Sequence, residues 1–297
     1  MINRFLDPRV LAGIANLELT ARTVVEGFIS GLHRSPHYGF SQEFAEFRPY
    51  VPGDDLRYVD WNVYARTERL YLKKYQGETN TRVTILLDAS ASMDFARKGV
   101  RKIDYARFLA ASMAYLAHQQ RDAVGLITFN DTVREFIVPS SRQGQWIKVL
   151  HGLNRSEAGK RTRTDFAEPF RQFQQHLNKR GLVLVVSDFL APAAAVLDAI
   201  KPLAFRGSDV VMMHVLDPEE LNPVLEDSRI LIDLETGDEM EVSPEFAEKE
   251  YPRRIRAHIE ALKEGAQASR ISYHLAVSSE PLDEALRRYL AVRQGRM

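Results

Sequence analysis

The chain has 297 residues, 45% of them hydrophobic, which is enough for one large domain or for one domain with an appendage. Its 40 basic and 40 acidic residues balance, so no global field attracts nucleic acid or acidic membranes. The chain has no cysteine, which excludes disulfides, thiol catalysis and cysteine-ligated zinc and suits a reducing compartment.

The sequence shows no targeting or membrane signal. The amino terminus, MINRFLDPRV, lacks the apolar core of a signal peptide. No stretch approaches the roughly 18–20 apolar residues that a membrane span needs. These features predict a soluble, cytoplasmic protein with no membrane span.

The amino-terminal part predicts a helix followed by a small β-containing module. Asp7 and Pro8 suit the N-cap and the first helical position, and apolar residues recur at helical spacing from there to Gly31. This pattern predicts one helix that packs an apolar face on the rest of the protein. The segments 40–51 and 70–75 predict strands, with a short helix between them that Asp54 or Asp55 would cap. The many charges here indicate either salt bridges that hold the module in place or a surface that docks a partner.

The most informative stretch is a run of branched apolar residues that ends in an acidic, hydroxyl-rich turn. Val83–Leu87 suits a strand buried on both faces, as in the middle of a parallel sheet. Asp88, Ser90 and Ser92 follow at alternate positions and place hard oxygens near one point. Such oxygens suit Mg²⁺ or Mn²⁺, and a charge buried at a strand tip requires a partner. The alternative is that Asp88 only caps the turn that follows it.

The rest of the chain alternates predicted strands and helices. Strands are expected at 123–129, 132–139, 181–187, 209–216 and 271–277, and helices at 102–120, 145–153, 166–179, 193–205, 245–268 and 282–292. A protruding hairpin is expected at 229–242. This order predicts an α/β fold with a doubly wound, mostly parallel sheet and helices on both faces. The expected domains are 1–79, with the helix and small module, and 80–297, the α/β domain with the hairpin insertion.

Further polar residues are expected at the same edge of the sheet as the turn after Val83–Leu87. Ligands of doubly wound sheets bind beyond the carboxyl ends of the strands. Asp188 closes a second apolar strand, and Thr164 lies in a loop that leads into a helix. The candidate metal site therefore consists of Asp88, Ser90, Ser92, Thr164 and Asp188.

This constellation resembles the metal-ion-dependent adhesion site of von Willebrand factor type A domains, over a region from about residue 82 to the carboxyl terminus. The resemblance implies the Rossmann-like α/β fold of that family. It implies that Ser90, Ser92 and Thr164 would ligate Mg²⁺ through their hydroxyls. Asp88 and Asp188 would act directly or through bound waters, and one coordination position would stay open for a carboxylate of a partner protein.

The segment upstream of the central strand carries a second, longer pattern. It runs from Arg48-x-Tyr50-x-Pro52-Gly53-Asp54-Asp55-x-Arg57 through Asp60-Trp61 and Ala65-Arg66 to Lys73. This pattern resembles the bacterial family called domain of unknown function fifty-eight, whose members pair such a module with a von Willebrand A-like domain. Members are often associated with MoxR-type AAA+ ATPases. The resemblance implies an accessory protein that acts with such an ATPase, or on its client, in assembling, activating or remodelling other proteins.

The loop before Thr164 departs from the type A pattern. Many type A domains have glycines there, whereas this chain has Arg161-Thr162-Arg163. Two arginines near the site would repel a cation or compete for Asp165. Without a metal, Asp88 would be satisfied by backbone amides or by an arginine.

The motifs favour a binding module over an enzyme. No second aspartate follows Asp88 two positions on, as an aspartyl-phosphate hydrolase needs, and no nucleophile elbow, Walker A loop or G-x-G-x-x-G motif is found. The prediction is a non-enzymatic module that captures an acidic residue of a partner through Mg²⁺. Two alternatives stay open: a metal-dependent phosphohydrolase, and a metal-free scaffold that binds through Phe40–Tyr75 and the Arg229–Val242 hairpin.

Overall fold

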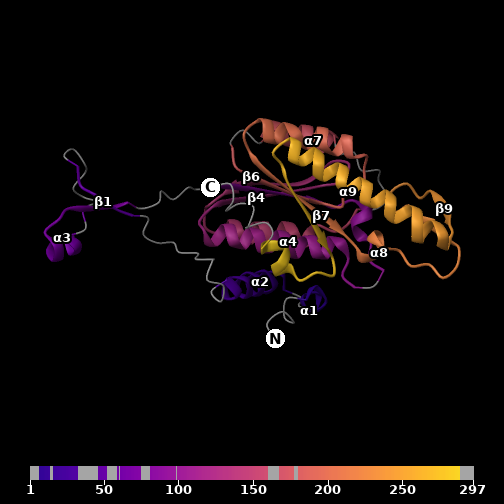
Figure 1. The fold of residues 1–297 in the computed structure, drawn as a ribbon, viewed down its shortest axis with the longest axis horizontal. Helices are drawn as coiled ribbons and strands as arrows, with labels where there is room; N and C mark the ends of the chain where they lie inside the picture. Colours follow the sequence, from indigo (N-terminus) through magenta and orange to yellow (C-terminus); the bar gives the residue numbers. More distant parts are fainter. Residues whose placement is uncertain are drawn as a thin grey trace. The chain divides into compact units, whose positions relative to one another are not determined.

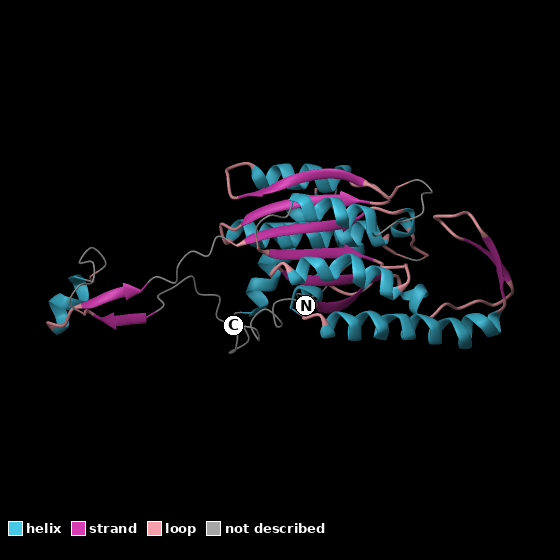
Figure 2. Ribbon diagram, turned by 90° about the horizontal axis from the view of Figure 1, so that it is seen from above, coloured by secondary structure: helices cyan, strands magenta, loops and turns pink. Residues whose placement is uncertain are grey.

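The computed structural model describes residues 7–13, 16–32, 46–51, 59, 61–74, 81–97, 99–159, 167–176 and 180–287. The chain divides into two compact units, one of residues 1–29 and 81–297 and the other of residues 30–80. Figures 1 and 2 show the larger unit as a central sheet with helices on both faces. The candidate site lies in this larger unit.

The larger unit is built on a six-stranded sheet in the order β10-β7-β6-β3-β4-β5. The parallel strands are β3 (Arg82–Asp88), β4 (Ala123–Phe129), β6 (Leu182–Ser187), β7 (Asp209–Leu216) and β10 (Ser272–Val277). The edge strand β5 (Val133–Ser140) runs antiparallel to β4. The strands β3, β4 and β6 are nearly continuous buried apolar runs, as strands covered on both faces must be. This topology confirms the predicted doubly wound, mostly parallel α/β sheet.

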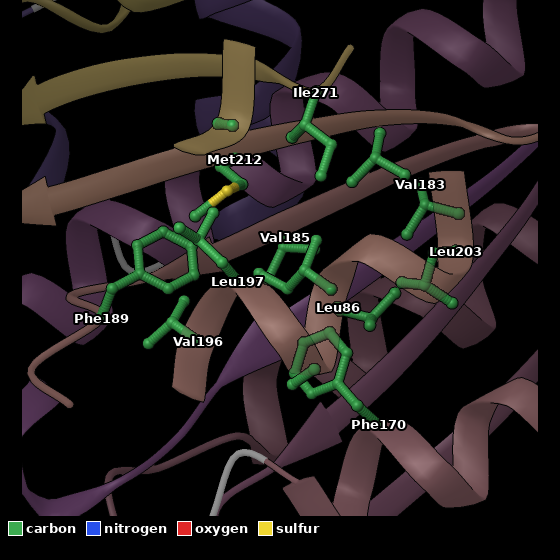
Figure 3. Close-up of a cluster of buried hydrophobic side chains, with 14 of the residues drawn as sticks. Leu86, Phe170, Val183, Val185, Phe189, Val196, Leu197, Leu203, Met212 and Ile271 are labelled. Carbon is green, nitrogen blue, oxygen red and sulfur yellow. The ribbon is translucent and has the colours of Figure 1, made fainter. Parts of the chain in front are cut away.

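Two layers of helices cover the sheet. One layer contains α6 (Ala167–His176), α7 (Ala193–Phe205) and α9 (Tyr251–Ala268), and the other contains α4 (Lys102–Gln119) and α5 (Gln145–Arg155). Figure 3 shows the first layer packing on the sheet, with Phe170, Val196 and Val185 in one buried cluster. Because β6 is held between the two layers, the turn that follows it has a fixed position.

The amino-terminal helix is broken in two, so the prediction of one continuous helix from Asp7 to Gly31 is wrong. The first helix, α1 (Pro8–Ala12), ends at Gly13. The second, α2 (Leu17–Leu32), follows Asn16, whose side chain accepts the amide hydrogen of Leu19. Asn16 is thus an N-cap in the middle of the apolar repeat, and the helical spacing continues across the break and conceals it.

The helix α2 packs on the α/β body. Its residues Val24 and Phe28 are buried, and the guanidinium of Arg22 lies 5.9 Å from the ring centroid of Tyr115 in α4. The predicted domain 1–79 grouped this helix with the small module, whereas the compact units place residues 1–29 with the α/β body. The second unit ends at Asn80, next to the predicted boundary.

The unit of residues 30–80 contains a short antiparallel pair and a helix. The pair joins β1 (Glu46–Pro49) to β2 (Tyr71–Lys74), and the helix is α3 (Trp61–Thr67). The strands lie within the predicted segments 40–51 and 70–75. The cap predicted at Asp54 or Asp55 lies outside the described residues.

The predicted hairpin is present and consists of β8 (Arg229–Ile232) and β9 (Glu239–Val242). A short helix that was not predicted, α8 (Pro218–Leu221), precedes it. Figure 2 shows this hairpin apart from the central sheet, beyond one end of α9. The helix predicted from residue 245 begins with a π-helical turn before α9, and residues 282–287 are helical. None of the helices in the described part of the chain combines the length and apolar character of a membrane span.

Candidate functional site

Three neighbouring parallel strands each end in a buried aspartate at one edge of the sheet. Asp88 ends β3, Asp188 follows β6 and Asp217 follows β7, and all three side chains are buried. Since these strands are adjacent in the order β7-β6-β3, their carboxyl ends meet at that edge. The structure therefore brings together Asp88 and Asp188, as the sequence predicts.

Asp88 is held by one hydrogen bond from its own turn and one from the next strand. Its Oδ1 accepts the amide hydrogen of Ser90 at 2.8 Å, and its Oδ2 accepts the hydroxyl hydrogen of Ser187 at 2.6 Å. The first bond is the turn cap that the alternative interpretation predicts. The second joins the ends of β3 and β6, and the same hydroxyl oxygen accepts the amide hydrogen of Phe189 at 2.9 Å. Ser187 is thus a positioning residue that the sequence pattern does not reveal.

The surroundings of Asp88 raise the pKa of its carboxyl group. Burial, helped by the negative charge of Asp188, raises the pKa of Asp88 to about 7, against the hydrogen bonds from Ser187 and Ser90, which lower it. A carboxyl group with that pKa carries a proton for much of the time near pH 7. A nearby cation would favour the ionised form and release the proton.

Lys102 is a buried cation at the site that the sequence prediction missed. Its side chain is 0% exposed, and its Nζ lies 2.7 Å from Oδ2 of Asp188 and 2.5 Å from Oε1 of Glu220 in α8. Burial acts to lower the pKa of Lys102, but the charges of Asp188 and Glu220 outweigh it and raise that pKa. The amine is therefore charged. A lysine at the first position of a helix looks solvent-exposed in a sequence, so no local signal identifies this role.

The buried charges around Lys102 do not cancel. Two carboxyl groups, those of Asp188 and Glu220, share the ammonium group of Lys102, and Asp88 is close enough to Asp188 to be affected by its negative charge. Lys102 pairs with Asp188 and Glu220, whereas the hydrogen bonds of Asp88 come from an amide and a hydroxyl. When Asp88 is ionised, its charge is therefore not paired with a cation among the described side chains, and a second cation beside it would compensate this charge.

Two serine hydroxyls lie on the turn that Asp88 caps. The Oγ atoms of Ser90 and Ser92 are 3.0 Å apart, and both side chains are buried. Adjacent ligands of an octahedral Mg²⁺, each at roughly 2.0–2.1 Å, lie about 2.9 Å from one another. No three His, Asp or Glu side chains converge on a metal position within the described ranges, so a cation here would depend on hydroxyls. The donor set therefore fits a hard cation bound by Ser90 and Ser92 next to Asp88.

The loop that leads to Thr164 reaches this turn. The amide of Gly159 donates to the carbonyl oxygen of Ala89 at 2.7 Å. A Cβ atom at Gly159 would lie 3.2 Å from that oxygen, so the close approach favours glycine. Thr164 itself, with Arg161 and Arg163, lies outside the described residues. Four of the five predicted site residues are thus placed together.

Arginines fasten the serine turn to its neighbours. Arg101 joins Asp94, at 2.8 Å, to the beginning of α4. Arg97 donates to Glu219 of α8 and to the carbonyl oxygen of Val224, both at 3.0 Å. These contacts connect the candidate site to α8 and to the segment around Val224, which leads into the β8–β9 hairpin.

Comparisons with known proteins agree with the resemblances drawn from the sequence. The family model described as "Protein of unknown function DUF58" matches residues 46–264. The uncharacterized protein Rv1480 of Mycobacterium tuberculosis is 28% identical over 258 residues, which cover 85% of this chain and 80% of the relative. The uncharacterized protein Mb1516 of Mycobacterium bovis matches to the same extent.

One solved structure shares the fold of the larger unit with a TM-score above 0.5. The conserved hypothetical protein BatB of Bacteroides thetaiotaomicron has a TM-score of 0.51 at 16% identity, over 73% of this chain and 100% of that chain. The SpRpn10 VWA domain has a TM-score of 0.40 at 12% identity, over 69% of this chain and 94% of that chain. Together with the strand order, the match to BatB is consistent with the predicted von Willebrand factor A-like fold.

Proposed function

The chain belongs to the DUF58 family of proteins of unknown function, and we propose that it is a non-enzymatic interaction module that captures an acidic residue of a partner protein through Mg²⁺. One observation carries the proposal. Asp88 is a buried carboxyl group next to the charge of Asp188 and without an ion-pair partner among the described side chains, on a turn whose two serine hydroxyls have the spacing of neighbouring Mg²⁺ ligands. Ser90 and Ser92 would hold the ion, and Thr164 would be a third hydroxyl ligand.

Each remaining residue of the site has a role that needs no chemistry beyond binding. A bound ion coordinated largely by neutral hydroxyls stays electrophilic and suits a partner's Asp or Glu. Asp88 compensates the ion when it releases its proton, and Ser187 holds Asp88 in position. Lys102 keeps Asp188 compensated at a fixed place. Manganese has the same ligand preferences and would occupy the same position.

The proposed partner is a MoxR-type AAA+ ATPase or its client. Support comes from the family resemblance and from the sequence, which has no Walker A loop and so requires a separate chain for ATP-driven work. The proposed place of action is the cytoplasm, in keeping with the lack of cysteine.

The first test is calorimetric titration of Mg²⁺ into the full chain and into Asp88→Asn and Ser90→Ala/Ser92→Ala. We expect saturable binding by the wild type and none by these variants, because they remove the charge and the ligands. Ser112→Ala is the matched control, since its buried hydroxyl donates to the carbonyl oxygen of Phe108 within α4. Mg²⁺ binding by Asp88→Asn as tight as that of the wild type would overturn the proposed site.

The second test measures partner binding and catalysis. Purified chain and the MoxR-type ATPase of the same cell are expected to associate in Mg²⁺ and to separate in EDTA, and Asp88→Asn should not associate in either. Association that is equal in Mg²⁺, in EDTA and with Asp88→Asn would favour the metal-free scaffold. Turnover of a generic phosphate ester that disappears in Asp88→Asn would instead favour the phosphohydrolase alternative.

A further inference from the structure

The β8–β9 hairpin exposes apolar side chains on both of its faces. Ile230 is 64% exposed, Leu231 47%, Ile232 50% and Met240 55%. Leu231 and Met240 are cross-strand partners on one face, and Ile230 and Ile232 lie on the other. Clustered apolar exposure of this kind marks a surface that another molecule covers.

The hairpin is also strongly acidic. Residues 229–242 carry five acidic residues and one arginine, and three more acidic residues lie within the three residues on either side, in a chain whose total charge is zero. Two of the acids lie on the apolar face itself, because Glu241 pairs with Ile230 and Glu239 pairs with Ile232 across the strands. An occupant of this face therefore meets isoleucines and carboxylates side by side.

The outer edge of β8 offers backbone hydrogen-bonding groups. The sheet contains two strands, so β8 and β9 each have one edge without a strand partner among the described residues. The amide of Asp233 donates to the carbonyl oxygen of Asp238 at 2.9 Å, which makes these residues a hydrogen-bonded pair. Such pairs alternate along an antiparallel ladder, so the backbone groups of Ile230 and Ile232 point away from β9.

The negative charge of the hairpin limits which kind of molecule can cover its apolar surface. Eight carboxylates repel nucleic acid and anionic lipid surfaces. A second copy of the chain would place acids against acids, which disfavours symmetric pairing of two hairpins. An extended protein segment in which Lys or Arg alternates with apolar residues complements the isoleucines, the carboxylates and the open edge together.

We propose that the β8–β9 hairpin docks a protein partner by adding such a basic, apolar segment along the edge of β8. The surface uses no residue of the candidate metal site and therefore does not depend on the Mg²⁺ proposal. The segment that leads into the hairpin nevertheless contacts the candidate site, since Arg97 donates hydrogen bonds to the carbonyl oxygen of Val224 and to the carboxylate of Glu219.

The test is photo-crosslinking of the full chain in the cells that encode it. A photoreactive amino acid replaces Leu231, on the face opposite the isoleucines, or Lys148, an exposed control position on α5. We expect a crosslink to a different protein from position 231 and none from position 148. Mass spectrometry of the crosslinked peptide should show Lys or Arg alternating with apolar residues.

Surface variants then test the chemistry of the contact. Glu239→Lys/Glu241→Lys should reduce the crosslink to the level of the Lys148 control, and Glu239→Gln/Glu241→Gln should reduce it partly, with unchanged melting temperatures. Asp88→Asn should leave the crosslink intact, which separates this proposal from the metal site. A crosslink to a second copy or to an acidic peptide, a yield equal to that of the control position, or a yield that survives charge reversal would each overturn the proposal.

Discussion

The ammonium group of Lys102 lies 2.7 Å from the carboxylate of Asp188. The exposed fraction is 0% for the side chain of Lys102 and 2% for that of Asp188. The bond joins the first turn of α4 to the end of β6, across 86 residues of sequence. Glu220 of α8 is a second partner, so one lysine connects three elements. The candidate metal site therefore has one built-in cation, and the proposed Mg²⁺ would be a second one, beside Asp88.

Replacing Lys102 should strongly destabilise the chain. Lys102→Met leaves Asp188 and Glu220 buried without their cation, which costs about 3–5 kcal/mol in comparable cases. Urea unfolding would measure the loss. The control is Lys201→Met, which removes the solvent-exposed pair of Lys201 with Asp198 and should cost at most about 1 kcal/mol.

The variant Lys102→Met also tests whether the positive charge of Lys102 weakens Mg²⁺ binding at the candidate site. Without its ammonium group, the site gains negative charge, so saturating Mg²⁺ should raise the melting temperature of Lys102→Met more than that of the wild type. An equal rise in both proteins would show that Lys102 and the ion are electrostatically independent.

Ser187 should set the pH at which Mg²⁺ binds. Asp88 has a pKa of about 7 and must release its proton beside a cation, so affinity should be full above that pH and fall by up to about tenfold per pH unit below it. The hydrogen bond from Ser187 lowers this pKa, so Ser187→Ala should move the midpoint to higher pH. Calorimetric titrations between about pH 6 and 9 would measure both curves. Ser112→Ala should leave the midpoint in place, and a coincident Ser187→Ala curve would contradict the positioning role.

His214 should make the fold sensitive to acid. This residue of β7 is fully buried, and burial lowers its pKa to about 3, while its Nδ1 lies 2.6 Å from the hydroxyl of Tyr273. The unfolded chain binds the proton near pH 6.5 and the folded chain does not, so stability falls as the pH drops below 6.5. Between about pH 7 and 5, the wild type should lose about 2 kcal/mol more than His214→Asn.

Urea unfolding at the two pH values gives this difference for His214→Asn. The control is His151→Asn at an exposed position of α5, which should lose stability in parallel with the wild type. If His214→Asn lost as much unfolding free energy between the two pH values as the wild type, a group other than His214 would cause the acid sensitivity.

Gly125 should not tolerate a side chain. A Cβ atom there would lie 2.6 Å from the carbonyl oxygen of Ile137 and 2.7 Å from the ring of Pro139 in β5. Because a backbone carbonyl has little room to move, Gly125→Ala should cost about 1–3 kcal/mol in thermal or urea unfolding. Gly13→Ala is the control, since its Cβ would lie 3.3 Å from the carbonyl oxygen of Val10 at an ordinary φ of −74°, and it should cost much less.

The sequence by itself determined the features that depend on neighbours along the chain. The buried run Val83–Leu87 and the alternation of strands and helices identified the α/β sheet, since burial on both faces requires an unbroken apolar strand. The spacing of Asp88, Ser90 and Ser92 predicted a cluster of oxygens, because a single turn brings alternate residues together. The break at Asn16 escaped prediction because the apolar repeat continues through it.

Only the tertiary structure decided which charges compensate one another. Ser187 reaches Asp88 across 99 residues, and Lys102 reaches Glu220 across 118. Whether a carboxylate is paired, and what its pKa becomes, depends on burial and on charged groups within a few ångströms. Helix packing on both faces of the sheet sets those distances, and no local pattern encodes them. For this reason the sequence predicts a metal site at Asp88 and Asp188, which stays a prediction, but it could not show that Lys102 is already the ion-pair partner of Asp188.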